Sequence, residues 1–431
     1  MPPISTLADR LLEGDRAVAA ELARGLLKPQ KDNLVERPWG GARLCDFKSL
    51  AASPCGMGRT FGESFELSAD DGDDEARLHP SVLVLADGST ITLPALLAVH
   101  AEPVLGADFV QRYGRRFPLL PKLLDVAELL SVQAHPPGNT EVYVIVEADP
   151  GATIRLGFAA DIAADSWTAQ LAGGRRDQQR LLELFGPDSA AELQTMLKPW
   201  LARRGAEPAE LETVLQLRLS DGARWTEVAT RLGSLHECFW AALDSLNAIP
   251  VKTGDVIYNA TPPRIAAATG KPVSAEVHAL GNPEGRGVFA LEIRRPGTTF
   301  RAWDNVRFPL RDIDIAAALE ALNLTATRPA EFVVEPKAIR PGVRRSVDCE
   351  YFRLEHLEPT PQLALDVRAS PPHCLHALAG RVSVTRSGDE PLGTLERGES
   401  ALVPAKVGPY RLVADGGPAA LVKVDLPPYA D

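Results

Sequence analysis

The stretch Leu130-Ser131-Val132-Gln133-Ala134-His135-Pro136 decides which fold we expect from this chain. Read as a strand, it places Gln133 and His135 two residues apart, so that both side chains lie on one face. Glu141 follows closely. An imidazole, an amide oxygen and a carboxylate that converge form a nitrogen and oxygen site suited to a divalent metal such as zinc. A fourth ligand has to come from elsewhere in a chain with eight histidines.

This pattern alone is a weak signal, because a histidine before proline is more often structural than a ligand and glutamine is a poor zinc ligand. Neighbouring segments strengthen it. Lys122 lies upstream, residues 140–145 begin a second strand, and residues 275–281 supply His278 at the edge of another strand. The order and types of these residues together favour a metal site.

Short β-like runs fill the first third of the chain after residue 33. Gly, Pro and Asp residues separate them, which is typical of a β-sandwich or jelly roll. The runs are residues 64–67, 81–85, 129–133, 141–146 and 153–158.

Helical periodicity marks two other segments. Residues 5–27 predict one amphipathic helix that ends before Pro29. Residues 160–247 predict a helical insertion, within which Ser189 fits the start of a capping box and Pro199 is expected to break or kink the helix. His236 lies among apolar residues there, and we interpret it as structural.

The C-terminal third returns to β texture. The sequence predicts strands at 256–259 and 288–293, a short helix at 314–322, a proline-bearing linker at 327–341, and strands at 351–354, 381–384, 400–403 and 420–424. Residues 395–404 echo residues 251–258, with a charged residue, a glycine turn, an acid and an apolar strand, which supports a second copy of the β unit. His373 and His376 would face opposite sides of a strand, so we expect no metal site there.

The bulk composition bounds the function. Forty-six Lys and Arg residues against 57 Asp and Glu give a net charge of −11, which argues against nucleic acid or an anionic membrane as the partner. A phosphate-bearing substrate would need a local basic pocket, for which Lys122, Arg301, Arg307 and Arg311 are candidates. Five scattered cysteines predict no disulfide framework and a reducing compartment. With no secretory signal and no membrane span in the sequence, we expect a cytoplasmic protein.

Several motifs in the right order resemble one known family, the type I mannose-6-phosphate isomerases (phosphomannose isomerases), which are zinc enzymes of the cupin superfamily. The resemblance runs from about residue 33 to the C-terminus, apart from a poorly matching middle. The motifs are residues 39–41, 62–68, 122–136, 140–145, 250–258, 277–281, 291–293 and 298–304.

The resemblance implies a specific site. Its four metal ligands would be Gln133, His135, Glu141 and His278, holding one Zn²⁺ per chain. Arg301 would be the active-site arginine, and Lys122 and Ser131 would lie near the substrate. The chain departs from the family in two places: only Pro-Pro-Gly-Asn-Thr separates His135 from Glu141, and residues 259–275 look like an insertion.

The fold expected from these observations is mainly β with a helical insertion: two cupin-type jelly-roll β-domains plus an α-helical domain. The expected parts are an N-terminal helix (1–32), a catalytic cupin domain in two pieces (33–158 and 249–343), the helical insertion (159–248) and a C-terminal cupin-like β-domain (344–431).

The expected reaction interconverts mannose 6-phosphate and fructose 6-phosphate by moving a proton between C1 and C2. The candidates for the base are Glu292, Lys122, Asp304 and a metal-bound water. Glu292 has the better case, because a strand-borne carboxylate near a cation lies in the pocket, although it is equally suited to holding a metal ligand in place. For Trp39, Glu63 and Glu66, which lie in matched motifs, we expect packing or supporting roles.

Other functions stay open. The insertion at 259–275 suits an isomerase of another sugar phosphate, and a cupin that binds sugars without catalysis is an alternative from a different class. A metal-dependent cupin oxygenase is disfavoured, since it would use mostly histidine ligands. We expect a monomer or homodimer.

Overall fold

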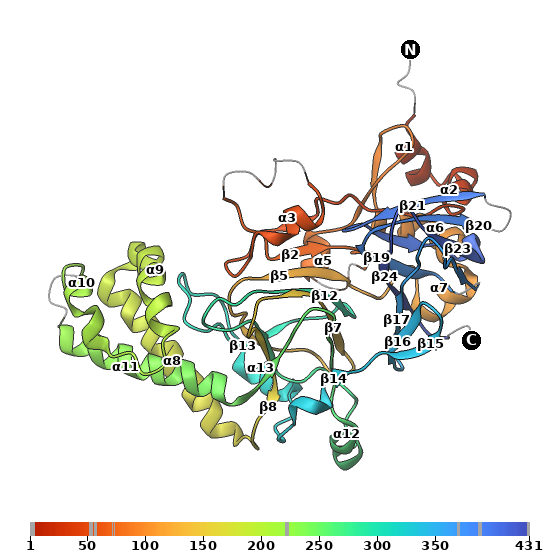
Figure 1. Cartoon of the computed structure of the whole chain (residues 1–431). Coiled ribbons are helices and arrows are strands. Elements are labelled where there is room, and N and C mark those ends of the chain that lie inside the picture. The colour runs from red at the N-terminus through yellow and green to blue at the C-terminus, as the bar shows by residue number, and fades with distance from the viewer. Residues whose placement is uncertain are drawn as a thin grey trace.

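The computed structural model describes residues 5–50, 55, 58–70, 72, 74–219, 224–368, 371–386 and 390–428. A β-rich body carries a helical arm at one end, which begins with α8 (Ala164–Phe185), and the C-terminal strands at the other (Figure 1). The expectation of a mainly β chain with a helical insertion is confirmed at this level. None of the helices in the described ranges is both long enough and apolar enough to cross a membrane.

Two antiparallel sheets face each other in the half of the body next to the helical arm. The side chains buried between them include Leu124, Tyr143, Ile154, Leu156 and Ile257. The first sheet has the order β1 (Leu34–Val35), β2 (Glu63–Phe65), β5 (Lys122–Val126), β12 (Val288–Arg294), β7 (Glu141–Ala148), β10 (Val256–Asn259) and β14 (Val333–Val334). The second has the order β13 (Phe300–Trp303), β6 (Val132–Ala134), β11 (His278–Leu280), β8 (Thr153–Phe158) and β9 (Leu246–Pro250).

A second pair of sheets forms the C-terminal part. Their shared core includes Leu357, Leu375, Val384, Leu395 and Leu412. One sheet has the order β15 (Lys337–Arg340), β16 (Val343–Asp348), β17 (Arg353–Leu357), β24 (Ala420–Asp425), β19 (His373–Ala379) and β22 (Ser400–Val403). The other has the order β18 (Leu365–Val367), β23 (Tyr410–Ala414), β20 (Arg381–Arg386) and β21 (Pro391–Glu396).

The linker predicted at 327–341 is wrong in part, because it contains two strands. β14 pairs with β10, and β15 pairs with β16. Each is the outermost strand of its sheet, where neighbouring prolines are tolerated because one side of the strand needs no ladder partner.

The single helix predicted at 5–27 is also wrong, since the chain forms α1 (Leu7–Leu12) and α2 (Arg16–Leu22). Gly14 between them has a φ of 92°, a conformation open to glycine. The Asp15 carboxylate then accepts hydrogen bonds from the amides of Ala17 and Val18. This N-cap starts a new helix where periodicity suggested a continuous one.

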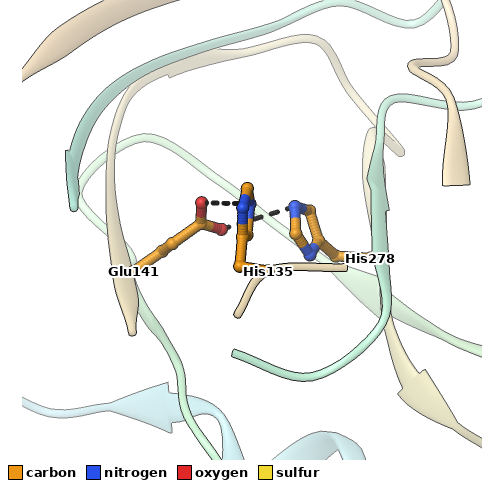
Figure 2. A group of neighbouring side chains, drawn as sticks. All are labelled: His135, Glu141 and His278. Carbon is orange, nitrogen blue, oxygen red and sulfur yellow. Dashed lines mark ion pairs between the residues drawn. The ribbon is translucent and has the colours of Figure 1, made fainter. Parts of the chain in front are cut away.

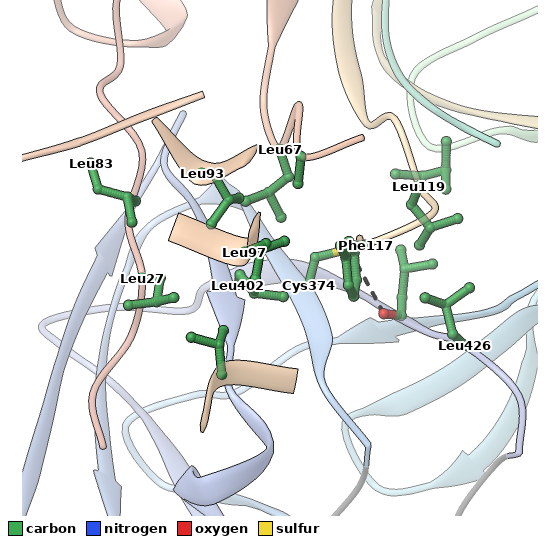
Figure 3. Close-up of a cluster of buried hydrophobic side chains, with 14 of the residues drawn as sticks. Leu27, Leu67, Leu83, Leu93, Leu97, Phe117, Leu119, Cys374, Leu402 and Leu426 are labelled. Atoms are coloured by element: carbon green, nitrogen blue, oxygen red, sulfur yellow. Dashed lines mark hydrogen bonds between the residues drawn. The ribbon is translucent and has the colours of Figure 1, made fainter. Parts of the chain in front are cut away.

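The N-terminal segments pack against the C-terminal sheets, together with α6 (Leu93–Leu105) and α7 (Ala107–Tyr113). Figure 3 shows Leu93 and Leu97 of α6 beside Leu402 and Cys374 of the C-terminal part. Leu27 and Leu402 also exchange backbone hydrogen bonds of 3.0 and 2.9 Å. The beginning and the end of the chain are therefore joined in one core.

His373 and His376, two of the three histidines of the C-terminal part, each contact a hydroxyl group. His373 lies 2.7 Å from the Tyr410 hydroxyl, and His376 lies 2.8 Å from the Ser400 hydroxyl. Burial lowers the pKa of each histidine to about 4. Ser400 in turn donates a 2.7 Å hydrogen bond to Glu66, which gives Glu66 a role in joining the two parts of the chain.

The helical arm confirms the helical texture predicted at 160–247, but not its details. Ser189 caps nothing, since its hydroxyl turns back to donate to the Gly186 carbonyl at 2.6 Å. Pro199 lies in the last turn of its helix, which continues to Leu201. The arm consists of α8, α9 (Ala190–Leu201), α10 (Glu212–Gln216) and α11 (Trp225–Asp244).

His236 of α11 is structural, as predicted: its Nε2 lies 2.9 Å from the Arg203 carbonyl, and its ring lies 4.9 Å from the Trp200 ring. The remaining elements are α3 (Arg43–Phe47), α5 (Asp74–Leu78), α12 (Pro263–Thr269), α13 (Ile315–Ala321), β3 (Val82–Val84), β4 (Thr90–Thr92) and short 3₁₀ turns at Pro187–Ser189, Pro208–Leu211, Pro329–Glu331 and Ala405–Val407.

A disulfide joins Cys45 of α3 to Cys55. The fold brings their Cα atoms to 5.9 Å, within the range that a disulfide spans, a proximity that the sequence spacing did not reveal. Among the described residues, Cys238, Cys349 and Cys374 take part in no disulfide. One bridge is not a framework, but the argument from cysteine usage for a reducing compartment no longer holds.

Candidate metal centre and substrate cleft

Strand pairing explains how distant residues meet at one place. β6 lies between β13 and β11, and its Gln133 is the register partner of both Arg301 and His278. Directly opposed residues in antiparallel strands present their side chains on the same face. Positions 133, 278 and 301 therefore form one row across the second sheet.

The first sheet supplies a complementary set. Glu141 opens β7 and is flanked by residues of β10 and β12, while Glu292 of β12 is flanked by residues of β5 and β7. The opposed pairs are Glu141–Asn259, Glu141–Arg294, Glu292–Lys122 and Glu292–Tyr143.

His135, Glu141 and His278 form a buried triad between the sheets (Figure 2). The Nε2 atom of His135 lies 2.8 Å from Oε1 of Glu141, and the Nε2 atom of His278 lies 3.4 Å from Oε2. The three candidate ligand atoms lie within 4.8 Å of one another. The short connection between His135 and Glu141 thus allows both side chains to reach one point.

Both imidazoles are oriented by backbone carbonyls. Nδ1 of His135 lies 3.2 Å from the Thr298 carbonyl, and Nδ1 of His278 lies 2.9 Å from the Glu276 carbonyl. A carbonyl accepts the Nδ1 proton, so Nε2 of each ring keeps a lone pair for a metal. Burial lowers the pKa of His278, which favours the neutral, ligating form.

The Glu141 carboxylate is held by two neighbours. The Tyr143 hydroxyl and the Asn259 amide, the latter at 3.2 Å, both donate to Oε2. Burial acts to raise the pKa of Glu141, but His135 and His278 hold that pKa well below its usual range. The side chain is therefore ionised and oriented, as a metal ligand requires.

Gln133 is positioned as a neutral donor beside the triad. Its amide nitrogen donates a 2.8 Å hydrogen bond to the Ser131 hydroxyl, so that the amide oxygen stays available. Gln133, Ser131 and His135 all line one cleft. Two imidazole nitrogens, a carboxylate and an amide oxygen suit a borderline metal such as zinc, and the side chains present fit one divalent ion.

The triad opens into a cleft of about 510 Å³ that carries charges of both signs. None of residues 260–275 lines it; the segment instead forms α12 and borders a separate cleft. The charged residues that line the metal cleft are Arg37, Lys122, Arg294, Arg301, Arg311, Glu63, Glu75, Glu141 and Glu292.

Lys122 lies on the floor of this cleft, between two carboxylates. Its Nζ is 3.3 Å from Glu63 and 3.2 Å from Glu75. Burial acts to lower the pKa of Lys122, but the two carboxylates leave that pKa above its ordinary value. Lys122 is thus a fixed cation, which does not suit it to the role of a base at neutral pH.

Arg301 and Arg311 reach the cleft, whereas Arg307 lines a different one. Asp304, a candidate base from the sequence, accepts hydrogen bonds from Arg307 at 3.0 Å and Arg311 at 2.7 Å. Both oxygens of this carboxylate are therefore engaged by guanidinium groups. Asp304 does not line the cleft around the metal site, and we assign it to holding the loop that follows β13.

Glu292 lies in the cleft with its carboxylate 3.4 Å from Nε of Arg294. Burial first, and the charge of Glu141 second, raise the pKa of Glu292 to about 7. A carboxyl group with this pKa exchanges protons readily near neutral pH.

Sequence reasoning missed several cleft residues. The alternation that selected Glu141 and Glu292 also places Tyr143 and Arg294 on the same faces, so these two were detectable. Arg37 and Glu75 lie outside the regular strand pattern, and no periodic signal marks them. Trp39 is buried and also lines the cleft, in line with the packing role expected of it.

The fold and the site together define a β-sheet protein with a candidate metal centre at the base of a charged cleft. Within this chain, residues 80–151 match the model of a family described as phosphomannose isomerase type I, catalytic domain. The matched segment contains Lys122, Gln133, His135 and Glu141. The resemblance to type I mannose-6-phosphate isomerases is thereby confirmed, and the match supports the expected enzyme class. No curated protein sequence matches the chain.

Several solved structures share the fold of this chain. A mannose 6-phosphate isomerase from Bacillus subtilis is 19% identical with a TM-score of 0.57, covering 93% of this chain and 99% of that one. A zinc-bound mannose 6-phosphate isomerase is 17% identical with a TM-score of 0.59 over the same shares. A putative mannosephosphate isomerase from Archaeoglobus fulgidus is 16% identical with a TM-score of 0.57, covering 93% and 98%. At these identities the likeness establishes the fold.

Proposed function

We propose that this protein is a zinc-dependent isomerase that interconverts mannose 6-phosphate and fructose 6-phosphate. The observation that carries the proposal is the convergence of His135, Glu141 and His278 beside Gln133, in the cleft that Arg301 also lines. A non-catalytic sugar-binding protein has no need of a potential metal-binding triad placed next to a buried carboxylate and a fixed cation. The family match at residues 80–151 and the zinc-bound structural neighbour support the choice of reaction and of metal.

The reaction requires a C–H bond next to a carbonyl group to lose its proton, with negative charge developing on the sugar oxygens. A zinc ion held by Gln133, His135, Glu141 and His278 would supply electrophilic stabilisation of that charge. Arg301 adds a fixed positive charge from the neighbouring strand. Lys122 and Ser131 border the space where the sugar phosphate would bind.

Glu292 is the group that we assign to proton transfer between C1 and C2. It lines the cleft, and its raised pKa matches the requirement for a base that also returns the proton. Arg294 at 3.4 Å orients the carboxylate. The competing role for Glu292, holding a ligand of the metal, finds less support because Tyr143 and Asn259 already hold Glu141.

The proposal extends to the organisation of the molecule. It includes a cupin-type jelly-roll topology for both β parts, the domain bounds given above, a monomer or homodimer, and a cytoplasmic location.

Removal of the metal is expected to abolish the isomerisation of mannose 6-phosphate, and one equivalent of zinc per chain is expected to restore it. The physical reason is that the side chains alone do not supply the electrophile at the sugar oxygens. The measurement is fructose 6-phosphate formation by the purified protein before chelation, after chelation and after zinc addition, with zinc content determined at each stage.

Zinc-loaded protein that binds mannose 6-phosphate without converting it would favour the sugar-binding alternative. Conversion of another aldose phosphate in preference to mannose 6-phosphate would keep the reaction type and change the substrate. Asn259, the first residue of the insertion at 259–275, contacts Glu141, but no residue of the insertion lines the cleft, which argues against a change of substrate by that segment.

Glu292→Gln is expected to lower kcat by about 10²- to 10⁴-fold, the usual contribution of a general base, with zinc content unchanged. Glu147→Gln is a suitable control, because Glu147 belongs to β7 of the same sheet but has a half-exposed side chain. If Glu292→Gln instead lost zinc at unchanged kcat per bound metal, the residue would be a support for the metal ligands.

A further inference from the structure

Three cations from three parts of the chain surround one carboxylate in the cleft. Oε2 of Glu75 lies 3.2 Å from Nζ of Lys122, and Oε1 lies 3.4 Å from Nη2 of Arg37 and 4.0 Å from Nη2 of Arg301. All four residues line the cleft that contains the candidate metal centre. Glu75 thus lies where the positive groups of the cleft converge.

Glu63, the other carboxylate of this cluster, has a different setting. It is part of β2, its side chain is 8% exposed, and it accepts hydrogen bonds from Nε of Arg37 at 2.6 Å and Nζ of Lys122 at 3.3 Å. Glu75 is on α5, a five-residue helix outside both sheets, and its side chain is 30% exposed. Glu63 therefore pairs with two cations from a strand of the first sheet, and Glu75 adds a second, more exposed carboxylate.

The charges of the cluster show what this second carboxylate does. Lys122, Arg37 and Arg301 carry three positive charges. Glu63 and Glu75 together carry two negative charges. With Glu75 withdrawn, the cluster would have an excess of two positive charges, which matches the two negative charges of a phosphate monoester. Ammonium and guanidinium groups bind carboxylate and phosphate oxygens with the same charge-assisted hydrogen bonds.

We propose that Glu75 is an internal competitor for the phosphate group of the substrate: its carboxylate occupies the anion site formed by Arg37, Lys122 and Arg301, and gives way when a dianionic phosphate binds. Glu75 is thereby a specificity-determining residue, because a neutral sugar has no anionic group that could replace the carboxylate beside these cations. The identity of the phosphate as part of a sugar substrate rests on the proposed function, whereas the anion site itself does not.

The test measures binding of inorganic phosphate to the zinc-loaded protein by titration calorimetry at pH 8, where phosphate is mainly a dianion. Glu75→Gln is expected to bind phosphate with a dissociation constant about tenfold lower than that of the wild type, since one charge-assisted ion pair no longer competes. Glu102→Gln, which removes an exposed carboxylate from α6, is expected to match the wild type and controls for net charge.

Glu75→Asp covers the case in which Glu75→Gln folds poorly, which thermal unfolding would reveal. The shorter side chain keeps the charge but draws it back from Lys122, so we expect it also to tighten phosphate binding, by less than Glu75→Gln. Unchanged or weaker phosphate binding in the folded variants would overturn the proposal.

Two further readouts locate the bound phosphate and keep the anion site distinct from the proposed function. The gain in phosphate affinity should persist after chelation, because none of the three cations is a candidate metal ligand; a gain that vanishes on chelation would put phosphate on the metal and overturn the proposal. Glu75→Gln should also lower KM for mannose 6-phosphate without raising kcat. Tighter phosphate binding in a protein that does not isomerise mannose 6-phosphate would reject the proposed function and keep the anion site.

Discussion

His278→Ala is expected to lower the affinity for zinc by about two to three orders of magnitude, one ligand's share of a typical protein–zinc binding free energy, and to abolish isomerisation. His278 is the ligand supplied by the strand beside Gln133, and its Nε2 lies 3.4 Å from the Glu141 carboxylate. Alanine would leave that buried, ionised carboxylate with one imidazole partner. The measurements are zinc stoichiometry by metal analysis and fructose 6-phosphate formation at saturating zinc.

The matched control is His356→Ala. His356 is also a buried strand histidine, but it belongs to the C-terminal sheet and pairs with the Ser346 hydroxyl at 3.0 Å. It should keep one zinc per chain and wild-type turnover. Wild-type zinc content and activity in His278→Ala would remove His278 from the ligand set and leave the resemblance as a statement about fold.

The four proposed ligands illustrate what a sequence reveals about a site. Strand alternation placed Gln133 and His135 on one face, neighbouring segments offered Glu141 and His278, and the resemblance implied that these four form one ligand set. The structure supplies the reason for their convergence: β6 pairs with β11 in the second sheet, and β7 of the facing first sheet brings Glu141 to them. That neighbour relation depends on non-local strand pairing, to which no local pattern in the chain refers.

Each feature that the sequence prediction missed has a specific structural cause. One residue pair, Gly14 and Asp15, divides a helix that looked continuous, since a positive φ and an N-cap outweigh apolar periodicity. Strands β14 and β15 escaped detection because none of their residues is buried, so neither shows the alternation of buried apolar and exposed positions that marks a strand. The Cys45–Cys55 bridge depends on how close the fold brings the two residues, which the spacing of the cysteines does not specify.

The cleft shows most clearly which functional residues can be predicted from the sequence and which cannot. Glu292 was predictable from its strand, and its opposed partner Lys122 was too. Glu75 was not, because it reaches the cleft from a five-residue helix that belongs to neither sheet. Residues on such short connecting helices carry no periodic signal, yet Glu75 is the residue that we propose to compete with phosphate in the cleft.

Arg301→Ala is expected to keep one zinc per chain and to lower kcat/KM by about 10²- to 10³-fold, the usual effect of removing one preorganised positive group from a transition state. Arg301 is opposed to Gln133 in the sheet, and it supplies none of the donor atoms of the triad. Arg301 lines the cleft. The substitution should therefore weaken interactions with the substrate and leave zinc binding unchanged.

The division of the effect between KM and kcat then locates the contact. A rise in KM alone would place Arg301 at the phosphate, in agreement with its 4.0 Å approach to Glu75; a fall in kcat would place it at the oxygens that gain charge. Arg301→Lys should recover part of the loss, because it keeps the charge without the planar fork. Arg218→Ala, which removes an exposed partner of Glu192 in the helical arm, should behave as the wild type. Loss of zinc from Arg301→Ala would contradict both roles, since it would mean that the residue maintains the sheet beside the ligands.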